Sequence, residues 1–114
     1  MTSQFDVIVV GAGTAGSVLA DRLSASGRHQ VLLLEAGGKP DGLFVQIPLG
    51  FPKVFKTKRD WAFETEPQSA VHDRRIFAPR GKMLGGSANI NAMMHQWCHP
   101  EDFDSWARGG ASGW

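Results

Sequence analysis

Two short apolar runs near the N-terminus flank a segment whose apolar residues recur at helical spacing. The runs cover residues 7–10 and 31–34, and each is continuous, as is typical of strands buried on both faces of a parallel sheet. Residues 15–26 lie between them and predict a helix, and Gly27 stands where a C-terminal cap is expected. The apolar face of that helix holds Ala15, Val18, Leu19 and Leu23. The pattern predicts a βαβ unit with a parallel sheet.

A glycine-rich turn joins the first apolar run to the predicted helix. Gly11, Gly13 and Gly16 have the spacing Gly-x-Gly-x-x-Gly. In dinucleotide-binding folds the first glycine makes a tight turn, the second lets the backbone approach a pyrophosphate, and the third lets the helix pack against the strand. The N-terminus of the helix adds unpaired N–H groups and a partial positive charge. We therefore predict that this turn binds a dinucleotide.

Glu35 follows the second apolar run, about twenty residues after the last glycine of the turn. A carboxylate at this place accepts hydrogen bonds from ribose hydroxyls and disfavours the 2′-phosphate of NADP, because two negative charges would face each other. NAD and FAD both carry a free 2′-hydroxyl, so Glu35 leaves both open. The alternative is an ordinary βαβ unit with a glycine-rich turn and no ligand, and the flanking elements disfavour it.

The middle of the chain predicts only short elements. Residues 43–55 are apolar but contain Pro48 and Pro52, which excludes a central strand and favours a loop or a short helical turn. Weak strand patterns occupy residues 60–67 and 76–78.

A second glycine-rich segment spans residues 79–94. Gly85 and Gly86 precede Ser87, a pattern typical of a turn that enters a helix, with Ser87 as the expected cap. Such a turn admits a phosphate-bearing ligand, but a helix start without a ligand explains this segment equally well. Asn91 would lie on that helix. Further along, Pro100 predicts the first position of another helix.

The bulk composition excludes several classes of protein. The 114 residues allow one domain at most, and 12 basic against 11 acidic residues give no basic field for nucleic acid. The single cysteine excludes an internal disulfide, and the ligand spacings of a zinc site are absent. No apolar run approaches the roughly 20 residues of a membrane span, and no signal peptide is evident, so we expect a cytoplasmic location.

Three segments together resemble the amino-terminal part of the glucose–methanol–choline (GMC) oxidoreductase family. They are residues 6–16, residues 61–68, and residues 80–87 with Ile90 and Asn91, and the likeness extends over essentially the whole chain. The resemblance implies an α/β fold with a Rossmann-like FAD-binding βαβ unit, FAD in place of NAD, and transfer of a hydride from the carbon of an alcohol to flavin N5. The alternatives are a flavin- or NAD-binding module without redox turnover, such as a lyase with structural FAD, and an inert fragment.

The resemblance also implies which residues bind the cofactor. At the pyrophosphate and the adenosine ribose it places Gly11, Gly13, Thr14, Ala15, Gly16 and Glu35. In the second glycine segment and along the flavin half it places Arg80, Gly81, Gly86, Ser87, Asn91, Ala92 and Met94. Trp61 is expected near the same pocket. Ile90 stands where some members attach the flavin through a histidine, so we predict that FAD is bound non-covalently.

The resemblance assigns no catalytic residue to this chain. The family's catalytic histidine lies in its carboxy-terminal half, and none of the four histidines here matches it. Only two strong parallel strands are evident, whereas each half of a doubly wound dinucleotide fold has three. We therefore expect residues 1–114 to be the amino-terminal portion of an FAD-binding domain in a larger two-domain fold. The substrate domain and the catalytic half are then absent, the isolated chain is inactive, and a small-molecule alcohol is the substrate of the full-length parent.

Overall fold

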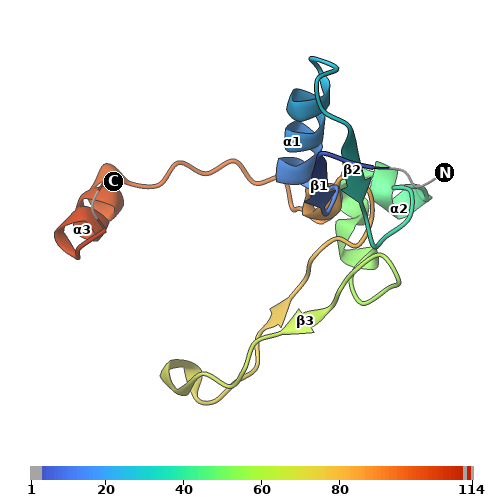
Figure 1. Ribbon diagram of the computed structural model, residues 1–114. Coiled ribbons are helices and arrows are strands. Elements are labelled where there is room, and N and C mark those ends of the chain that lie inside the picture. The colour runs from blue at the N-terminus through green and yellow to red at the C-terminus, as the bar shows by residue number, and fades with distance from the viewer. Residues whose placement is uncertain (1–3, 112, 114) are drawn as a thin grey trace.

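The βαβ unit forms where the apolar pattern predicts it. A computed structural model of the chain describes residues 4–111 and 113 (Figure 1). Strands β1 (Val7–Val10) and β2 (Val31–Leu34) pair in parallel, with Val7 opposite Val31 and Val10 opposite Leu34. Helix α1 (Thr14–Ser24) connects them and begins and ends within two residues of its predicted bounds. The N–H of Gly27 donates to the carbonyl of Ser24 at 2.9 Å and closes the turn after the helix.

The middle of the chain also agrees with its pattern. The proline-interrupted stretch forms helix α2 (Leu43–Gln46) and the 3₁₀ helix η1 (Pro48–Lys53). The two weak strand patterns become β3 (Phe63–Glu64) and β4 (Phe77–Ala78), which pair antiparallel. A second 3₁₀ helix, η2 (Ser69–Val71), lies in the loop between them, and Figure 1 shows this hairpin projecting away from the βαβ unit.

The helix predicted after the second glycine turn is much shorter than expected. Only the 3₁₀ helix η3 (Gly86–Ile90) forms, and Asn91 already has extended backbone. The Asn91 side chain donates to the carbonyl of Ala88 at 2.8 Å and accepts from the N–H of Met93 at 2.7 Å. These local bonds compete with helical backbone bonds and end the helix. Asn91 therefore does not lie on a helix, and that prediction was wrong.

The prediction that Ser87 caps this helix was also wrong. Gly85 is the N-cap residue, and no side chain caps η3. The Ser87 hydroxyl instead accepts a hydrogen bond from the N–H of Gly81 at 3.0 Å. The hydroxyl thus joins two parts of the second glycine segment instead of satisfying a helix terminus.

Helix α3 (Pro100–Arg108) begins at the predicted proline and has a complete capping box. The His99 ring accepts from the N–H of Glu101, and the Asp102 carboxylate accepts from the N–H of His99. In Figure 1 an extended segment carries α3 well away from the βαβ unit. Its apolar residues Phe103 and Trp106 contact each other, with ring centroids 5.3 Å apart.

The buried core is small and is formed in part by the second glycine segment. Val54, Met83 and Ile90 form its buried cluster, while Val9 and Ala12 are buried within the βαβ unit. The expectation that β1 and β2 are buried on both faces is wrong for this chain, since Val10 is 82% exposed and Ile8 58%. The radius of gyration is 18.5 Å, against about 13 Å for a compact domain of about 100 residues. Helix α1 packs against both strands, and no other helix of the described residues contacts β1 or β2.

Candidate cofactor-binding site

The two glycine turns, which lie far apart in the sequence, meet in the structure. The N–H of Gly85 donates to the carbonyl of Ala12 at 2.7 Å. Gly86 packs against Gly13 so closely that a Cβ on Gly86 would lie 2.9 Å from the Gly13 α-carbon. Side chains are absent from both sides of this contact, so bare backbone from both turns borders one common space.

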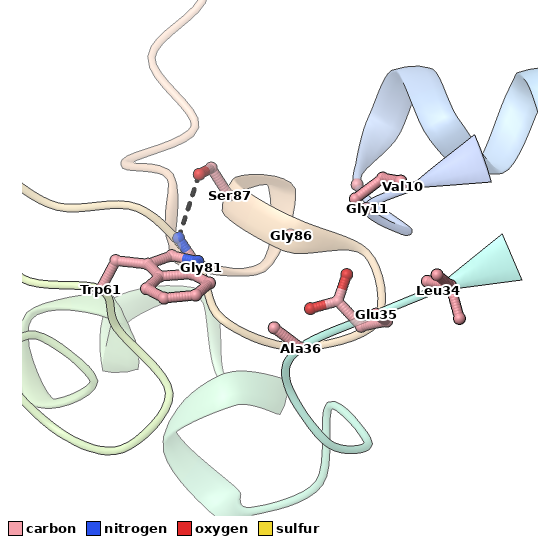
Figure 2. Close-up of a pocket in the computed structure, with 10 residues that line it drawn as sticks. Val10, Gly11, Leu34, Glu35, Ala36, Trp61, Gly81, Gly86 and Ser87 are labelled. Atoms are coloured by element: carbon pink, nitrogen blue, oxygen red, sulfur yellow. Dashed lines mark hydrogen bonds between the residues drawn. The ribbon is translucent and has the colours of Figure 1, made fainter. Parts of the chain in front are cut away.

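That space is a cavity of about 580 Å³ at the carboxyl ends of β1 and β2 (Figure 2). Ligand cavities in proteins commonly measure about 300–1,000 Å³, and open α/β sheets bind ligands outside the carboxyl ends of their strands. The lining residues are Val10, Gly11, Gly13, Leu34, Glu35, Ala36, Trp61, Gly81, Gly86 and Ser87. Both glycine turns therefore contribute to the same cavity.

Glu35 is held in this cavity by backbone hydrogen bonds. Its Oε2 accepts from the N–H of Ala12 and its Oε1 from the N–H of Gly37, both at 2.8 Å. Figure 2 shows the carboxylate directed into the space between Gly86 and Trp61. Each carboxylate oxygen can accept more than one hydrogen bond. Glu35 is therefore fixed in orientation and still able to accept bonds from ribose hydroxyls.

The N-terminus of α1 opens toward the same region. Gly13 is its N-cap residue, no side chain caps the helix, and its first turn carries no acidic residue. The first N–H groups of a helix have no partner within it and attract anions. Gly16 brings the helix close to the turn, because a Cβ there would lie 1.8 Å from the carbonyl oxygen of Gly11. This terminus has the donors and the polarity that a pyrophosphate requires.

Trp61 forms the opposite wall of the cavity. Its indole stacks on Phe63, with centroids 5.7 Å apart and planes 9° apart. The Nζ atom of Lys82 lies 4.3 Å from the centre of the indole ring, a cation–π arrangement that holds the ring in place. The N–H of Trp61 donates to the carbonyl of Arg80 at 2.8 Å, so this wall is tied to the second glycine segment.

Asp60 holds the segments next to Trp61 in place. It is the one buried charged residue among those the structure describes. Its carboxylate accepts from the N–H groups of Lys56 at 2.9 Å, Ala62 at 3.0 Å and Arg80 at 2.9 Å. Burial raises the pKa of the Asp60 carboxyl, but these three hydrogen bonds lower it by more, and the net pKa lies below its ordinary value. The carboxylate therefore stays ionised and joins the segments on either side of Trp61.

Half of the cofactor-binding residues predicted from the sequence line the cavity. They are Gly11, Gly13, Glu35, Trp61, Gly81, Gly86 and Ser87. Thr14, Ala15 and Gly16 form the first turn of α1 beside it, and Arg80 is exposed next to Gly81. The structure does not bring Asn91, Ala92 and Met94 to this cavity. They line a separate hollow of about 480 Å³ together with Met93 and His95.

Sequence reasoning missed four residues that shape the site. Val10, Leu34 and Ala36 line the cavity, and Asp60 supports its wall. The first three have a signal in the sequence, since they end or follow the apolar runs whose carboxyl ends form the binding edge. Asp60 has no such signal, because its partner Arg80 lies twenty residues away.

The part of the chain that the structure describes holds neither a metal centre nor a spanning helix. No group of three or more His, Cys, Asp or Glu side chains among those residues could hold a metal ion. No helix formed by the same residues is long and apolar enough to cross a membrane.

The fold and the cavity define a dinucleotide-binding α/β unit, and comparison with known proteins gives its family. The family model for GMC oxidoreductases matches residues 5–114. The chain therefore belongs to the GMC oxidoreductase family, as its sequence pattern indicated.

Individual relatives agree with this assignment. An oxygen-dependent choline dehydrogenase from Photobacterium profundum is 49% identical over 100% of this chain and 20% of its own length. The crystal structure of pyridoxine 4-oxidase from Mesorbium loti matches with a TM-score of 0.78 and 37% identity, over 92% of this chain and 21% of that one. Formate oxidase from Aspergillus oryzae, in a structure concerned with FAD modification, matches with a TM-score of 0.73 and 34% identity over 91% and 19%.

The relatives confirm FAD as the predicted cofactor and show what share of their length this chain spans. FAD is the cofactor indicated both by the family and by the structural neighbours. The chain spans about a fifth of the length of the curated relatives it matches. The α/β fold with a two-stranded parallel sheet agrees with the amino-terminal FAD-binding region of these proteins.

Proposed function

We propose that this chain forms the site for the ADP half of FAD in an oxidoreductase that acts on the CH–OH group of a small alcohol. The carrying observation is that both glycine turns and the Glu35 carboxylate border one cavity. The uncapped N-terminus of α1 would bind the pyrophosphate. Glu35, oriented by Ala12 and Gly37, would accept hydrogen bonds from the adenosine ribose.

The chemistry belongs to the cofactor, and this chain positions it. Bound FAD supplies the acceptor for a hydride taken from the alcohol carbon. The support for an alcohol as substrate is the similarity to oxygen-dependent choline dehydrogenase. No residue of this chain is proposed as the acid or base of the reaction, and we expect the isolated chain to show no alcohol turnover.

We further propose that FAD is held without a covalent bond to η3. Ile90, at the position where some members of the family carry a flavin-linked histidine, is only 4% exposed and packs with Val54 and Met83. A buried aliphatic side chain offers no nucleophile to the flavin. Denaturation of the FAD-loaded chain in acid should therefore release all of the flavin into the supernatant after centrifugation.

The cofactor assignment is tested by titrating the purified chain with FAD and FMN and following flavin absorbance near ~450 nm. FMN has the flavin but lacks the adenylate, so a site for the ADP half should bind FAD at least about tenfold more tightly. ADP should displace FAD competitively. Equal affinity for FAD and FMN, or no displacement by ADP, would contradict the proposal. NADH in place of FAD tests the alternative of a nicotinamide site, and tighter binding of NADH would favour it.

A further inference from the structure

A second, strongly basic hollow lies beside the cofactor cavity. It has a volume of about 240 Å³ and is lined by Gly38, Lys39, Asp41, Lys58, Arg59 and Lys82. We call it the basic hollow. Four of the twelve basic residues of the chain thus meet at one place, although the chain as a whole is nearly neutral.

The single acid of the basic hollow does not cancel its charge. Asp41 forms an ion pair with Arg59. The hydrogen bond from Arg59 and its positive charge hold the pKa of the Asp41 carboxyl below its usual value, so the carboxylate offsets Arg59. Three lysines remain, and Lys39 and Lys58 are solvent-exposed.

The basic hollow and the cofactor cavity are lined by adjacent residues, since Gly81 lines the cavity and Lys82 lines the hollow. The N–H of Lys82 donates to the carbonyl of Arg59 at 2.8 Å, and the N–H of Leu84 donates to the carbonyl of Gly38 at 2.9 Å. These bonds fix the three segments that form the hollow. Lys82 also lies over the indole of Trp61, which lines the cofactor cavity. A ligand attracted to the lysines therefore arrives at the edge of the cofactor site.

We propose that the positive charge of the basic hollow attracts the pyrophosphate of FAD and thereby raises the association rate of FAD with the adjacent cavity. This inference rests on the proposed function, because it takes FAD as the ligand of the adjacent cavity. A local field of one sign raises the association rate of an oppositely charged ligand and leaves its dissociation largely unchanged. The effect is screened over a Debye length of about 8 Å at physiological ionic strength, so it should decline with salt.

The test is stopped-flow measurement of FAD association with the whole chain, using flavin fluorescence. The variant K39E/K58E reverses two charges of the basic hollow. The matched control, R28E/R74E, makes the same change of net charge in the loop between α1 and β2 and in the loop between β3 and β4. Circular dichroism verifies that both variants keep the fold of the parent chain.

We expect K39E/K58E to lower the association rate constant about threefold or more at low salt, with the dissociation rate unchanged. The control R28E/R74E should lower the association rate constant by less. The difference in association rate constant between the two variants should vanish near ~0.5 M salt. Equal slowing in both variants would show an effect of net charge alone and overturn the inference, as would no slowing in either. A parent chain that binds no FAD overturns the proposed function and this inference with it, whereas normal binding with unchanged rates overturns only this inference.

Discussion

Gly13 and Gly86 pack against each other, and this contact joins the two glycine turns around one cavity. A Cβ on Gly86 would lie 2.9 Å from the Gly13 α-carbon, and Gly86 has a φ of +57°. The site therefore depends on the absence of a side chain at a position that the fingerprint motif does not include. Each turn supplies only part of the cavity lining. Neither turn considered separately is therefore clear evidence for a ligand.

Replacing Gly86 by alanine should separate the two turns. G86A combines a steric clash with a left-handed backbone conformation that costs an L-residue about 1–2 kcal/mol. Gly27 provides a matched control, because it has a φ of +67° but a Cβ added there would meet nothing within 4 Å. We expect both variants to lose stability in denaturant unfolding, and G86A alone to lose FAD binding by about tenfold or more. Parallel losses of FAD affinity in G86A and G27A would refute a special role for the contact.

Glu35 should contribute to affinity through its charge and its fixed orientation. E35Q replaces a carboxylate that accepts from the N–H groups of Ala12 and Gly37 with an amide that can accept through only one oxygen. Hydrogen bonds to charged groups contribute about 1.5–3 kcal/mol, so we expect FAD affinity to fall about tenfold or more. The exposed Glu64 of β3 serves as control through E64Q. Unchanged FAD affinity in E35Q, measured by calorimetry, would exclude Glu35 from the site.

Trp61 should act as an aromatic wall for the cofactor. W61L keeps an apolar side chain but removes the ring on which Phe63 and Lys82 are arranged. Aromatic contacts contribute about 0.5–1.5 kcal/mol beyond burial, which corresponds to a loss of about two- to tenfold in FAD affinity. Trp97, which is 86% exposed and does not line the cavity, is the control through W97L. The idea fails if W61L and W97L bind FAD alike in a fluorescence titration.

Asp60 should make the stability of the chain depend on acid pH. Its pKa is lowered in the folded state from 3.8, so its stabilisation is fully present above the unfolded-state pKa and is lost as the pH falls through the folded value. D60N places an amide NH₂ group among backbone N–H donors and should cost roughly 1–3 kcal/mol near neutral pH. The difference in unfolding free energy between parent and D60N should narrow below about pH 4.

The control for this measurement is D104N, at an exposed position of α3. It should leave the unfolding free energy near neutral pH unchanged. A constant difference between parent and D60N across the acid range would show that the Asp60 carboxylate is not the titrating group.

Local patterns were sufficient to predict the βαβ unit. The continuous run at residues 7–10, the glycine spacing and the second run at residues 31–34 each act over a few residues, and the structure forms the strands at those positions. Gly16 illustrates why, because its lack of a side chain is required by a carbonyl only five residues away.

Features that depend on distant partners were not predictable in the same way. The bond of Asp60 to Arg80 and the contact of Gly13 with Gly86 require the tertiary fold. The helix predicted after Gly86 ends early because the Asn91 side chain binds nearby backbone groups, a competition that periodicity does not reveal. Val10 is exposed at the end of β1, where it lines the cofactor cavity, although its strand was predicted correctly.

The most direct test of the account is a two-dimensional NMR titration of the ¹⁵N-labelled chain with FAD. If one FAD lies between the two glycine turns, the amide signals of Gly11 and Gly13 and those of Gly81 and Gly86 should shift together and fit one dissociation constant. Signals from α3, which stands apart from the βαβ unit (Figure 1), should stay unchanged. Shifts confined to a single turn, or two turns that titrate with different constants, would contradict the shared site.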